Sequence, residues 1–310
     1  MSMTRRSFLG ASALALGGCA TCCGKGPRHA SDYAGVQVGV ITYSYRSMPR
    51  DWRDVLRYVQ EDRLGTIELM GDDAETYIGI PRTRPKDKSQ WAAFAAQNEK
   101  LRLGADMAKF AEMRRIFADA GVDIHIVKFG SVGTGSDEIN DYYFNVAKAL
   151  GARAITREVP APKDFDVIGP RCAKFADKHG VFVAFHNHTQ INSTTYDGSL
   201  LGYSENLRIN FDVGHYVAAS VGDPLDFVRK YHDRIFSIHI KDRTTKEHGQ
   251  KNLAFGTGDT PLYPLFDLLR GNGWDYPCDI ELEYAIPEGS DAVKEVLACN
   301  KYCRSGILRG

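Results

Sequence analysis

The sequence lacks an excess of charge of either sign, and it lacks a long apolar run. Its 310 residues contain 39 Lys and Arg against 39 Asp and Glu, so the formal net charge is zero. A protein that binds nucleic acid mainly by neutralising phosphates carries a basic excess, so we expect no nucleic-acid partner. The apolar run at residues 10–18 is too short and too rich in Gly and Ala to span a membrane.

Cysteine is also scarce in the part of the chain that is expected to fold. The seven cysteines fall into a group near the N-terminus and four scattered positions: Cys19, Cys22 and Cys23, then Cys172, Cys278, Cys299 and Cys303. The last two have the i, i+4 spacing of one helix face, but no second Cys or His pair completes a zinc site. We therefore expect them to pack as small buried apolar side chains.

Residues 1–30 have the pattern of an export signal and not of a folded segment. Arg5 and Arg6 stand before a Ser-Phe-Leu sequence and the short apolar run, which is the form of a twin-arginine signal. The alternative is a chance arginine pair. Residues 16–19 are similar to a lipoprotein cleavage site, and whether Cys19 carries a lipid anchor is left open. We expect a periplasmic protein, with or without a membrane anchor.

Residues 31–310 predict one large α/β domain. No low-complexity stretch or linker interrupts them, and short β-rich runs alternate with amphipathic segments. Eight runs are expected to be strands: 36–42, 66–69, 123–128, 154–157, 181–185, 208–211, 235–240 and 279–282. Eight strands that alternate with helices in a single domain of this size predict a (β/α)8 TIM barrel.

Signals between the strands predict where helices begin and where long connections lie. Asp223-Pro224 and Thr260-Pro261 each place a capping side chain before a proline at the first helical position. Two connections, 70–88 and 243–261, are longer than usual. Both should leave the C-terminal ends of strands, so we expect them to wall or cap a substrate pocket; the alternative is that they are disordered surface loops.

Several expected strands end in residues that can bind a metal ion. In chain order these are Glu158; His186 and His188; Asp212 and His215; His239, Lys241 and Asp242; and Glu281 and Glu283. The C-terminal ends of parallel barrel strands converge on one face. Carboxylates and imidazoles placed there can surround one divalent cation.

The strand pattern indicates which of these side chains point inward. An isolated buried carboxylate at Asp212 would be costly without a cation, although a helix cap is the alternative. Alternation along the strand places His239 and Lys241 on the inward face. Lys241 could meet a substrate oxyanion or phosphate, or transfer a proton. Of the two glutamates on the last strand, Glu281 lies deeper and is the expected ligand, and Glu283 could orient a ligand or remain solvated.

Five short motifs together carry a resemblance to a known family. Residues 36–303 resemble the xylose-isomerase-like barrel superfamily, which includes sugar phosphate isomerases and epimerases, ketose 3-epimerases, inosose dehydratases and AP-endonuclease-type nucleases. The resemblance rests on Phe185 to His188, Phe211 to His215, Ile238 to Asp242, Phe255 to Asp259 and Pro277 to Glu283. It implies a divalent ion held by Glu, Asp, His and Glu from strands five to eight. The last three match Asp212, His239 and Glu281.

The first ligand of the family pattern is missing, because His186 occupies the position of the strand-five glutamate. Epimerases of the family pass a proton between two metal-bound glutamates, so simple ketose 3-epimerisation is in doubt. Either Glu158 moves in or His186 itself completes the metal site. The expected catalytic residues are His188, His215, Lys241 and Glu281, with a histidine free to act as a base near neutral pH.

The resemblance implies a divalent-metal-dependent isomerase, epimerase or lyase that acts on a sugar or keto-sugar through an enediolate. The imidazoles favour Mn²⁺ or Zn²⁺ over Mg²⁺, Co²⁺ or Fe²⁺. A 3-keto-glycoside lyase or hydratase would suit an exported protein better than a sugar-phosphate enzyme. Two alternatives belong to other functional classes: a non-catalytic carbohydrate-binding barrel and an AP-type endonuclease. The neutral net charge opposes the endonuclease. The oligomeric state is left open.

Overall fold

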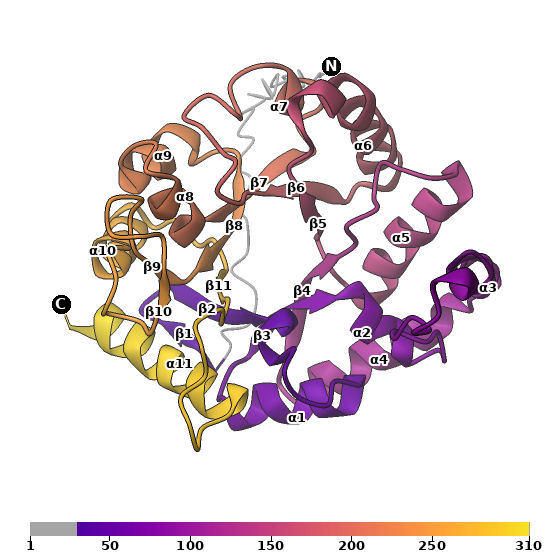
Figure 1. Ribbon diagram of the computed structural model, residues 1–310, viewed down its shortest axis with the longest axis horizontal. Coiled ribbons are helices and arrows are strands. Elements are labelled where there is room, and N and C mark those ends of the chain that lie inside the picture. The colour runs from indigo at the N-terminus through magenta and orange to yellow at the C-terminus, as the bar shows by residue number, and fades with distance from the viewer. Residues whose placement is uncertain (1–29, 310) are drawn as a thin grey trace, which may run out of the picture.

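The computed structural model describes residues 30–309, and its centre is a closed ring of eight parallel strands (Figure 1). The ring closes because β2 pairs with both β3 and β11. In spatial order its strands are β2 (Val36–Ile41), β11 (Cys278–Ile280), β8 (Ile235–Ile240), β7 (Leu207–Asp212), β6 (Phe182–His186), β5 (Ala154–Glu158), β4 (Asp123–Lys128) and β3 (Thr66–Met70). The predicted (β/α)8 TIM barrel is confirmed. The predicted export signal, apart from Ala30, and Cys19 lie outside the described residues.

Helices form an outer layer around this ring (Figure 1). They are α1 (Trp52–Glu61), α2 (Gly71–Thr76), α3 (Trp91–Leu103), α4 (Met107–Asp119), α5 (Asp137–Leu150), α6 (Phe165–His179), α7 (Ser199–Gly202), α8 (Val213–Ala219), α9 (Pro224–Tyr231), α10 (Leu262–Asn272) and α11 (Ala292–Leu308). Among the described residues, no helix is both long enough and apolar enough to cross a membrane. Short elements complete the fold: the edge strand β1 (Asp32–Tyr33), the ribbon of β9 (Asp242–Arg243) and β10 (Asn252–Leu253), and the 3₁₀ turns η1 (Thr42–Tyr45), η2 (Lys88–Gln90) and η3 (Pro162–Asp164).

The two predicted helix starts have different outcomes. Asp223 caps α9 by accepting a hydrogen bond from the Leu225 backbone N–H, and Pro224 is the first helical residue, as predicted. The prediction at Thr260-Pro261 is wrong, because α10 begins only at Leu262. The Thr260 hydroxyl instead accepts a hydrogen bond from the Arg243 backbone N–H at 3.0 Å, so it fixes the start of the long connection. The four described cysteines are buried and form no disulfide.

The inside of the barrel is polar, whereas many barrels fill this space with layers of branched aliphatic side chains. Fully buried polar residues from several strands meet there: Thr66, Glu68, Thr156, Asn210, Ser237, His239 and Asp279. Near the N-terminal ends of the strands, His125 lies 2.6 Å from the Thr66 hydroxyl and 2.9 Å from an Asp279 carboxylate oxygen. A side chain at Gly39 would collide with Asp279, since a Cβ there would lie 2.3 Å from its Oδ1. The glycine therefore makes room for the buried carboxylate.

The buried carboxyl group of Asp62 predicts a pH-dependent stability. The Tyr45 hydroxyl donates to Asp62 Oδ2 at 2.5 Å, and burial raises the pKa of Asp62 from 3.8 to about 8. The folded protein therefore holds this proton more tightly than the unfolded chain. The resulting stability is full below about pH 4 and is lost as the pH rises through about 8. We expect the melting temperature of the wild type to fall more between pH 6 and 9 than that of Asp62→Asn. Calorimetry across this range tests the prediction, and equal slopes for the two proteins would contradict it.

Candidate metal centre

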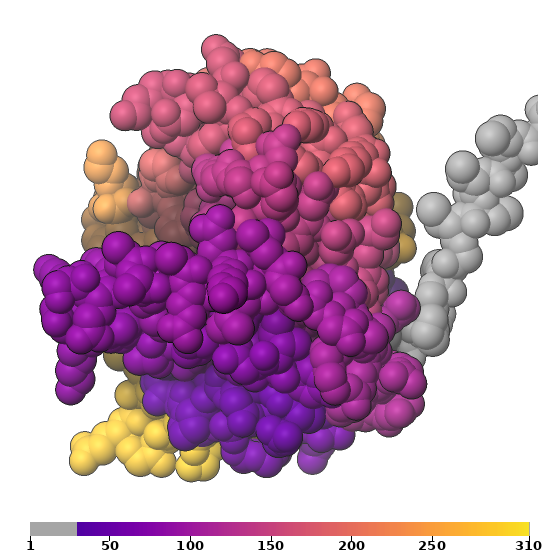
Figure 2. All heavy atoms as spheres, turned by 90° about the vertical axis from the view of Figure 1, so that its right-hand side faces the viewer, coloured from indigo at the N-terminus to yellow at the C-terminus, as the bar shows by residue number. Residues whose placement is uncertain are grey.

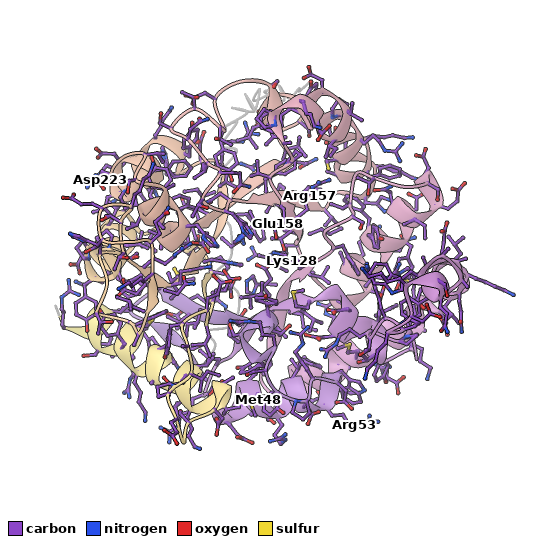
Figure 3. The ribbon with its side chains drawn as sticks, in the orientation of Figure 1. Met48, Arg53, Lys128, Arg157, Glu158 and Asp223 are labelled. Carbon is purple, nitrogen blue, oxygen red and sulfur yellow. The ribbon has the colours of Figure 1, made fainter. Side chains whose placement is uncertain are left out.

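The C-terminal ends of the strands bring the sequence candidates to one mouth of the barrel. The strand register places Glu158 opposite His186, and Asp212 opposite His239. Figure 3 shows Glu158 near the middle of the ring, far from the peripheral Asp223. Parallel pairing between β8 and β11 places Glu281 one residue beyond the last paired position, at the same mouth.

Four buried residues form a cluster with metal-ligand chemistry: His186, Asp212, His215 and Glu281. One ligand atom from each lies within 4.8 Å of those of the other three. Three of the four are predicted metal ligands, and the fourth, His215, was expected to be catalytic. His215 joins them because it stands on the first turn of α8, directly after the strand that carries Asp212.

The two carboxylate oxygens of Asp212 have different surroundings. Oδ1 accepts a hydrogen bond from the His215 backbone N–H at 2.6 Å and so caps α8. The helix-cap alternative is therefore correct, but it uses only one oxygen. Oδ2 is buried and accepts no hydrogen bond from the described residues, although Lys241 Nζ lies 3.1 Å away. Burial raises the pKa of Asp212 to about 7, with Lys241 opposing the shift.

The histidine His186 is held as a neutral ligand would be. Its Nδ1 lies 2.7 Å from Asn210 Oδ1, which can only accept a hydrogen bond. Nδ1 is therefore the donor, and Nε2 remains as the nitrogen with a free electron pair. Burial lowers the pKa of His186 to about 3, so the ring is neutral at ordinary pH. A fixed tautomer with a second hydrogen-bond partner is the usual setting of a metal-binding imidazole.

The imidazole of His239 bridges two carboxylates. Its Nε2 lies 2.8 Å from Glu68 Oε2, and its Nδ1 lies 3.2 Å from Glu281 Oε2. Burial alone would lower the pKa of His239, but the two glutamates outweigh it and raise the pKa well above the ordinary value. Because both ring nitrogens are engaged, His239 orients Glu281 in this arrangement. That His239 binds the metal stays a prediction. To do so, the ring would have to give up its contact with Glu68 or with Glu281.

The lysine Lys241 lies among the carboxylates of the mouth. Its ammonium group is 2.7 Å from Glu283 Oε2 and 2.8 Å from Glu281 Oε2. Burial would lower the pKa of Lys241, but Asp212 and Glu281 outweigh it and raise the pKa, so the side chain stays charged. Lys241 therefore offsets the negative charge of the site. Its nitrogen also lies 3.0 Å from His215 Nε2, while Arg243 contacts the other ring nitrogen at 2.5 Å. To bind a metal ion, His215 would therefore have to give up one of these contacts, as His239 would.

The remaining candidates, Glu158 and His188, form a pair beside the cluster. Glu158 contacts Lys128 and His188 through its two oxygens, each at 2.7 Å. The hydrogen bond with Glu158 raises the pKa of His188, whose side chain is 49% exposed. The His188 ring stacks on that of His215 at 4.6 Å between centroids. Glu158 would have to leave both partners to bind a metal, whereas His188 already faces solvent beside the cluster.

Most of the barrel matches a known family model. Residues 90–302 match the model described as the xylose isomerase-like TIM barrel. The chain belongs to this family. The resemblance seen in the sequence motifs is thereby confirmed.

Similar proteins and solved structures show how far the similarity of this chain extends. An inosose dehydratase of Lacticaseibacillus casei is 28% identical over an alignment of 142 residues, with 40% of this chain and 47% of that protein covered. The chain thus spans about half the length of the curated relatives that it matches. The IOLI protein, solved with a zinc atom, has a TM-score of 0.61 at 13% identity, with 88% and 99% of the chains covered. The 3-keto-D-glucoside 4-epimerase YcjR of E. coli has a TM-score of 0.59 at 14% identity, with 86% and 100% covered. At such identities the two structures show a shared fold.

The donor set of this family member suits a divalent ion. Two imidazoles and two carboxylates converge, and the buried Asp212 Oδ2 accepts no hydrogen bond from the described residues. Mixed nitrogen and oxygen ligation of this kind is common for Zn²⁺, Mn²⁺, Co²⁺ and Fe²⁺ and less so for Mg²⁺, which prefers oxygen alone. The residues present therefore fit the metal that the fold implies.

Sequence reasoning missed three charged residues of this site, Glu68, Lys128 and Arg243, the last at the start of the second long connection. Glu68 is the one charged residue in the β3 sequence Thr-Ile-Glu-Leu-Met, and Lys128 ends β4. Lys128 stands at the end of an expected strand, so the convergence of strand ends predicts it. Glu68 lies within its strand, where alternation places it on the same face as Thr66.

The two long connections occupy different places. The second begins at β9 and contains β10, and its Arg243 contacts the His215 ring at the centre of the mouth. Asp242 Oδ2 holds the turn after β10 by accepting hydrogen bonds from the backbone N–H groups of Gly256, Thr257 and Gly258. The first forms α2 and then lines a separate cavity beside α3. That either connection covers a bound substrate stays a prediction.

Glu68 is expected to position His239. It is fully buried, accepts from the Thr156 hydroxyl at 2.5 Å and from Asn210 Nδ2 at 3.1 Å, and contacts His239. Burial would raise the pKa of Glu68, but His239 outweighs it and lowers the pKa to about 2. We expect Glu68→Gln to weaken metal binding about 10- to 100-fold, as for other lost partners of this kind. Competition with a chelating dye tests this, and Glu61→Gln, at an exposed position, is the control. Equal affinities in the two variants would contradict the role.

Proposed function

We propose that this chain is a divalent-metal-dependent enzyme that moves a proton next to the carbonyl group of a sugar or keto-sugar. The observation that carries the proposal is the buried cluster of two imidazoles and two carboxylates, with the exposed His188 beside it. A bound ion would polarise a carbonyl and its neighbouring hydroxyl and so make the adjacent C–H bond acidic. Isomerisation, epimerisation and elimination all begin with loss of that proton.

The residues around the cluster have separate tasks in this proposal. His186, Asp212, His215 and Glu281 would hold the ion. His188 would take the carbon-bound proton, because its ring is accessible and its partner Glu158 stabilises the protonated form. Lys241 and Arg243 would place positive charge near the developing enediolate oxygen.

Elimination or hydration of a 3-keto-glycoside is the finer assignment that we favour. His186 replaces the glutamate that paired-glutamate epimerases of the family use, which leaves one exposed base in place of two opposed carboxylates. One base suffices for elimination, since the leaving group departs from the same enediolate. The names of two relatives, a dehydratase and a 3-keto-glucoside epimerase, support chemistry next to a carbonyl.

Product analysis in D₂O would test the proposal. Protein loaded with Mn²⁺ or Zn²⁺ would be incubated with 3-keto-glucosides and with simple ketoses, and the carbon adjacent to the carbonyl would be followed by NMR. Deuterium at that carbon, or an unsaturated product, would support it, and a His188→Ala variant should show neither. Tight metal-dependent sugar binding with no exchange at any carbon would point instead to a non-catalytic carbohydrate-binding barrel.

We also propose that the protein is exported by the twin-arginine route, with lipidation at Cys19 as an option. The support is the pair Arg5-Arg6 before a short apolar run. Cell fractionation should find the wild type in the periplasm or on a membrane, and Arg5→Lys combined with Arg6→Lys should remain in the cytoplasm. A double variant that is exported normally would contradict this route, and labelling with a radioactive fatty acid would show whether Cys19 is modified.

A further inference from the structure

A cavity lies outside the barrel mouth, between α2, α3 and the start of α5. Its volume is about 670 Å³, and among the described residues that line it none belongs to the metal cluster. Figure 2 shows this part of the chain, in purple, projecting from the body of the molecule. Phe129 forms a partition between the barrel and this region, because it fills the space where a side chain at Gly71 would lie and stacks on Tyr143 at 4.5 Å. The cavity is therefore separate from the candidate metal centre.

The wall of the cavity contains hydrogen-bond acceptors that lack donors. Asn98 is the one buried residue of α3, with 6% of its surface exposed. Its Nδ2 donates to the Pro81 carbonyl at 3.3 Å, but its Oδ1 is buried and has no partner among the described residues. Asp72 Oδ1, on α2, is also buried and has no hydrogen-bond partner among the described residues. Buried acceptors of this kind cost free energy until a donor reaches them, so the cavity favours a ligand that carries hydroxyl groups.

The charges that line the cavity balance one another. Arg102 makes two hydrogen bonds to Glu75, at 2.8 and 2.9 Å, so both are neutralised. Asp72 lies 3.6 Å from Arg50 and 3.9 Å from Arg82, and Arg82 lies 3.1 Å from Asp73. Arg84 and Glu99 complete a lining with as many acidic as basic residues. With the charges compensated in this way, the cavity has no strong preference for an anion or a cation.

Aromatic rings supply the apolar part of the wall. Trp91 is 40% exposed and lines the cavity together with Phe94 and Tyr143. These rings stand beside the charged and polar side chains of the lining, and a volume of about 670 Å³ lies within the usual range for a small-molecule site. The C–H face of a sugar ring packs against such aromatic walls while its hydroxyls reach the acceptors.

We propose that this cavity is a second binding site, which takes the ring of a neutral sugar and needs no metal. Hydroxyl groups of the sugar would donate to Asn98 Oδ1 and Asp72 Oδ1, and Trp91 would cover one side of the ring. The site would hold a glycan or a second sugar on the outside of the barrel while the mouth processes its own substrate. The inference does not depend on the reaction at the metal centre.

Binding to chelator-treated protein tests this site apart from the metal centre. The probes are methyl β-D-glucopyranoside and cellobiose, and ligand-observed NMR and calorimetry give the affinity and the number of sites. We expect one saturable site in the wild type. Asn98→Leu should weaken it at least tenfold, because a lost hydrogen bond to a buried acceptor has an effect of about this size. Trp91→Ala should weaken it at least as much, because it removes the aromatic surface on which the ring would pack.

Matched variants make the outcome decisive. Asn272→Leu removes an exposed asparagine near the end of α10 and should bind as the wild type does. Asp212→Ala should also leave this site intact, whereas it would remove a metal-dependent site. Trp91 is partly exposed, so Trp91→Ala should fold even if Asn98→Leu does not. The proposal is overturned if the chelator-treated wild type binds neither probe, or if Trp91→Ala binds as tightly as the wild type. Neither result would affect the proposed reaction.

Discussion

Replacing Glu281 by Gln is expected to lower turnover at least a thousandfold while the barrel remains folded. The side chain keeps its shape but loses the charge that faces Lys241 at 2.8 Å and His239 at 3.2 Å. It also belongs to the four-residue cluster, and a neutral amide is a weaker metal ligand than a carboxylate. Loss of several kcal/mol of charge stabilisation corresponds to about three powers of ten in rate.

The neighbouring glutamate offers a matched control for this prediction. Glu283 also contacts Lys241, at 2.7 Å, but its side chain is 21% exposed and it stands outside the cluster. Glu283→Gln should therefore lower turnover less than tenfold. Steady-state rates and metal affinity would be measured for both variants. Equal losses in the two would show that Glu281 acts only as a partner of Lys241.

Replacing Lys241 by Met is expected to destabilise chelator-treated protein by about 3–5 kcal/mol, the usual cost of removing one partner of a buried ion pair. Its ammonium group is almost fully buried and contacts Asp212, Glu281 and Glu283 within 3.1 Å. The three carboxylates would lose the cation that offsets their mutual repulsion. Added Mn²⁺ or Zn²⁺ should restore more stability to this variant than to the wild type, because a bound cation would take over that role.

Urea unfolding with and without metal measures this difference. Lys230→Met is the control, since Lys230 is an exposed lysine paired with Asp197 and should change the unfolding free energy by about 1 kcal/mol or less. If Lys241→Met were as stable as the wild type in the absence of metal, Lys241 would not be offsetting the carboxylates.

Much of this site could be predicted because backbone geometry alone creates it. His186, Asp212 and Glu281 converge since each stands at the C-terminal end of a parallel strand, whatever its side chain does. The eight strands themselves were visible as short β-rich runs between helical segments. Barrel topology then places their ends at one mouth.

The contacts inside the mouth could not be predicted in the same way. His239 was predicted as a ligand, but its two nitrogens contact Glu281 and Glu68, the latter 171 positions away in the sequence. The partners of a buried imidazole depend on its rotamer and on competing hydrogen bonds across the barrel. Residue spacing in the sequence predicts neither of these. Thr260 illustrates the same limit, because a long-range hydrogen bond to Arg243 replaced its expected capping role. For the cavity beside α3, the sequence indicated only that the connection at residues 70–88 is long.

Metal content tests most directly whether the four-residue cluster binds a divalent ion. Wild type and Asp212→Ala would be purified in parallel, incubated with Mn²⁺ or Zn²⁺, desalted and measured by elemental mass spectrometry. We expect about one divalent ion per wild-type chain and almost none in the variant, since Asp212 contributes a buried ligand oxygen to the cluster. A wild type that remains metal-free after this treatment would contradict the proposed function and favour a barrel that binds sugar without catalysis.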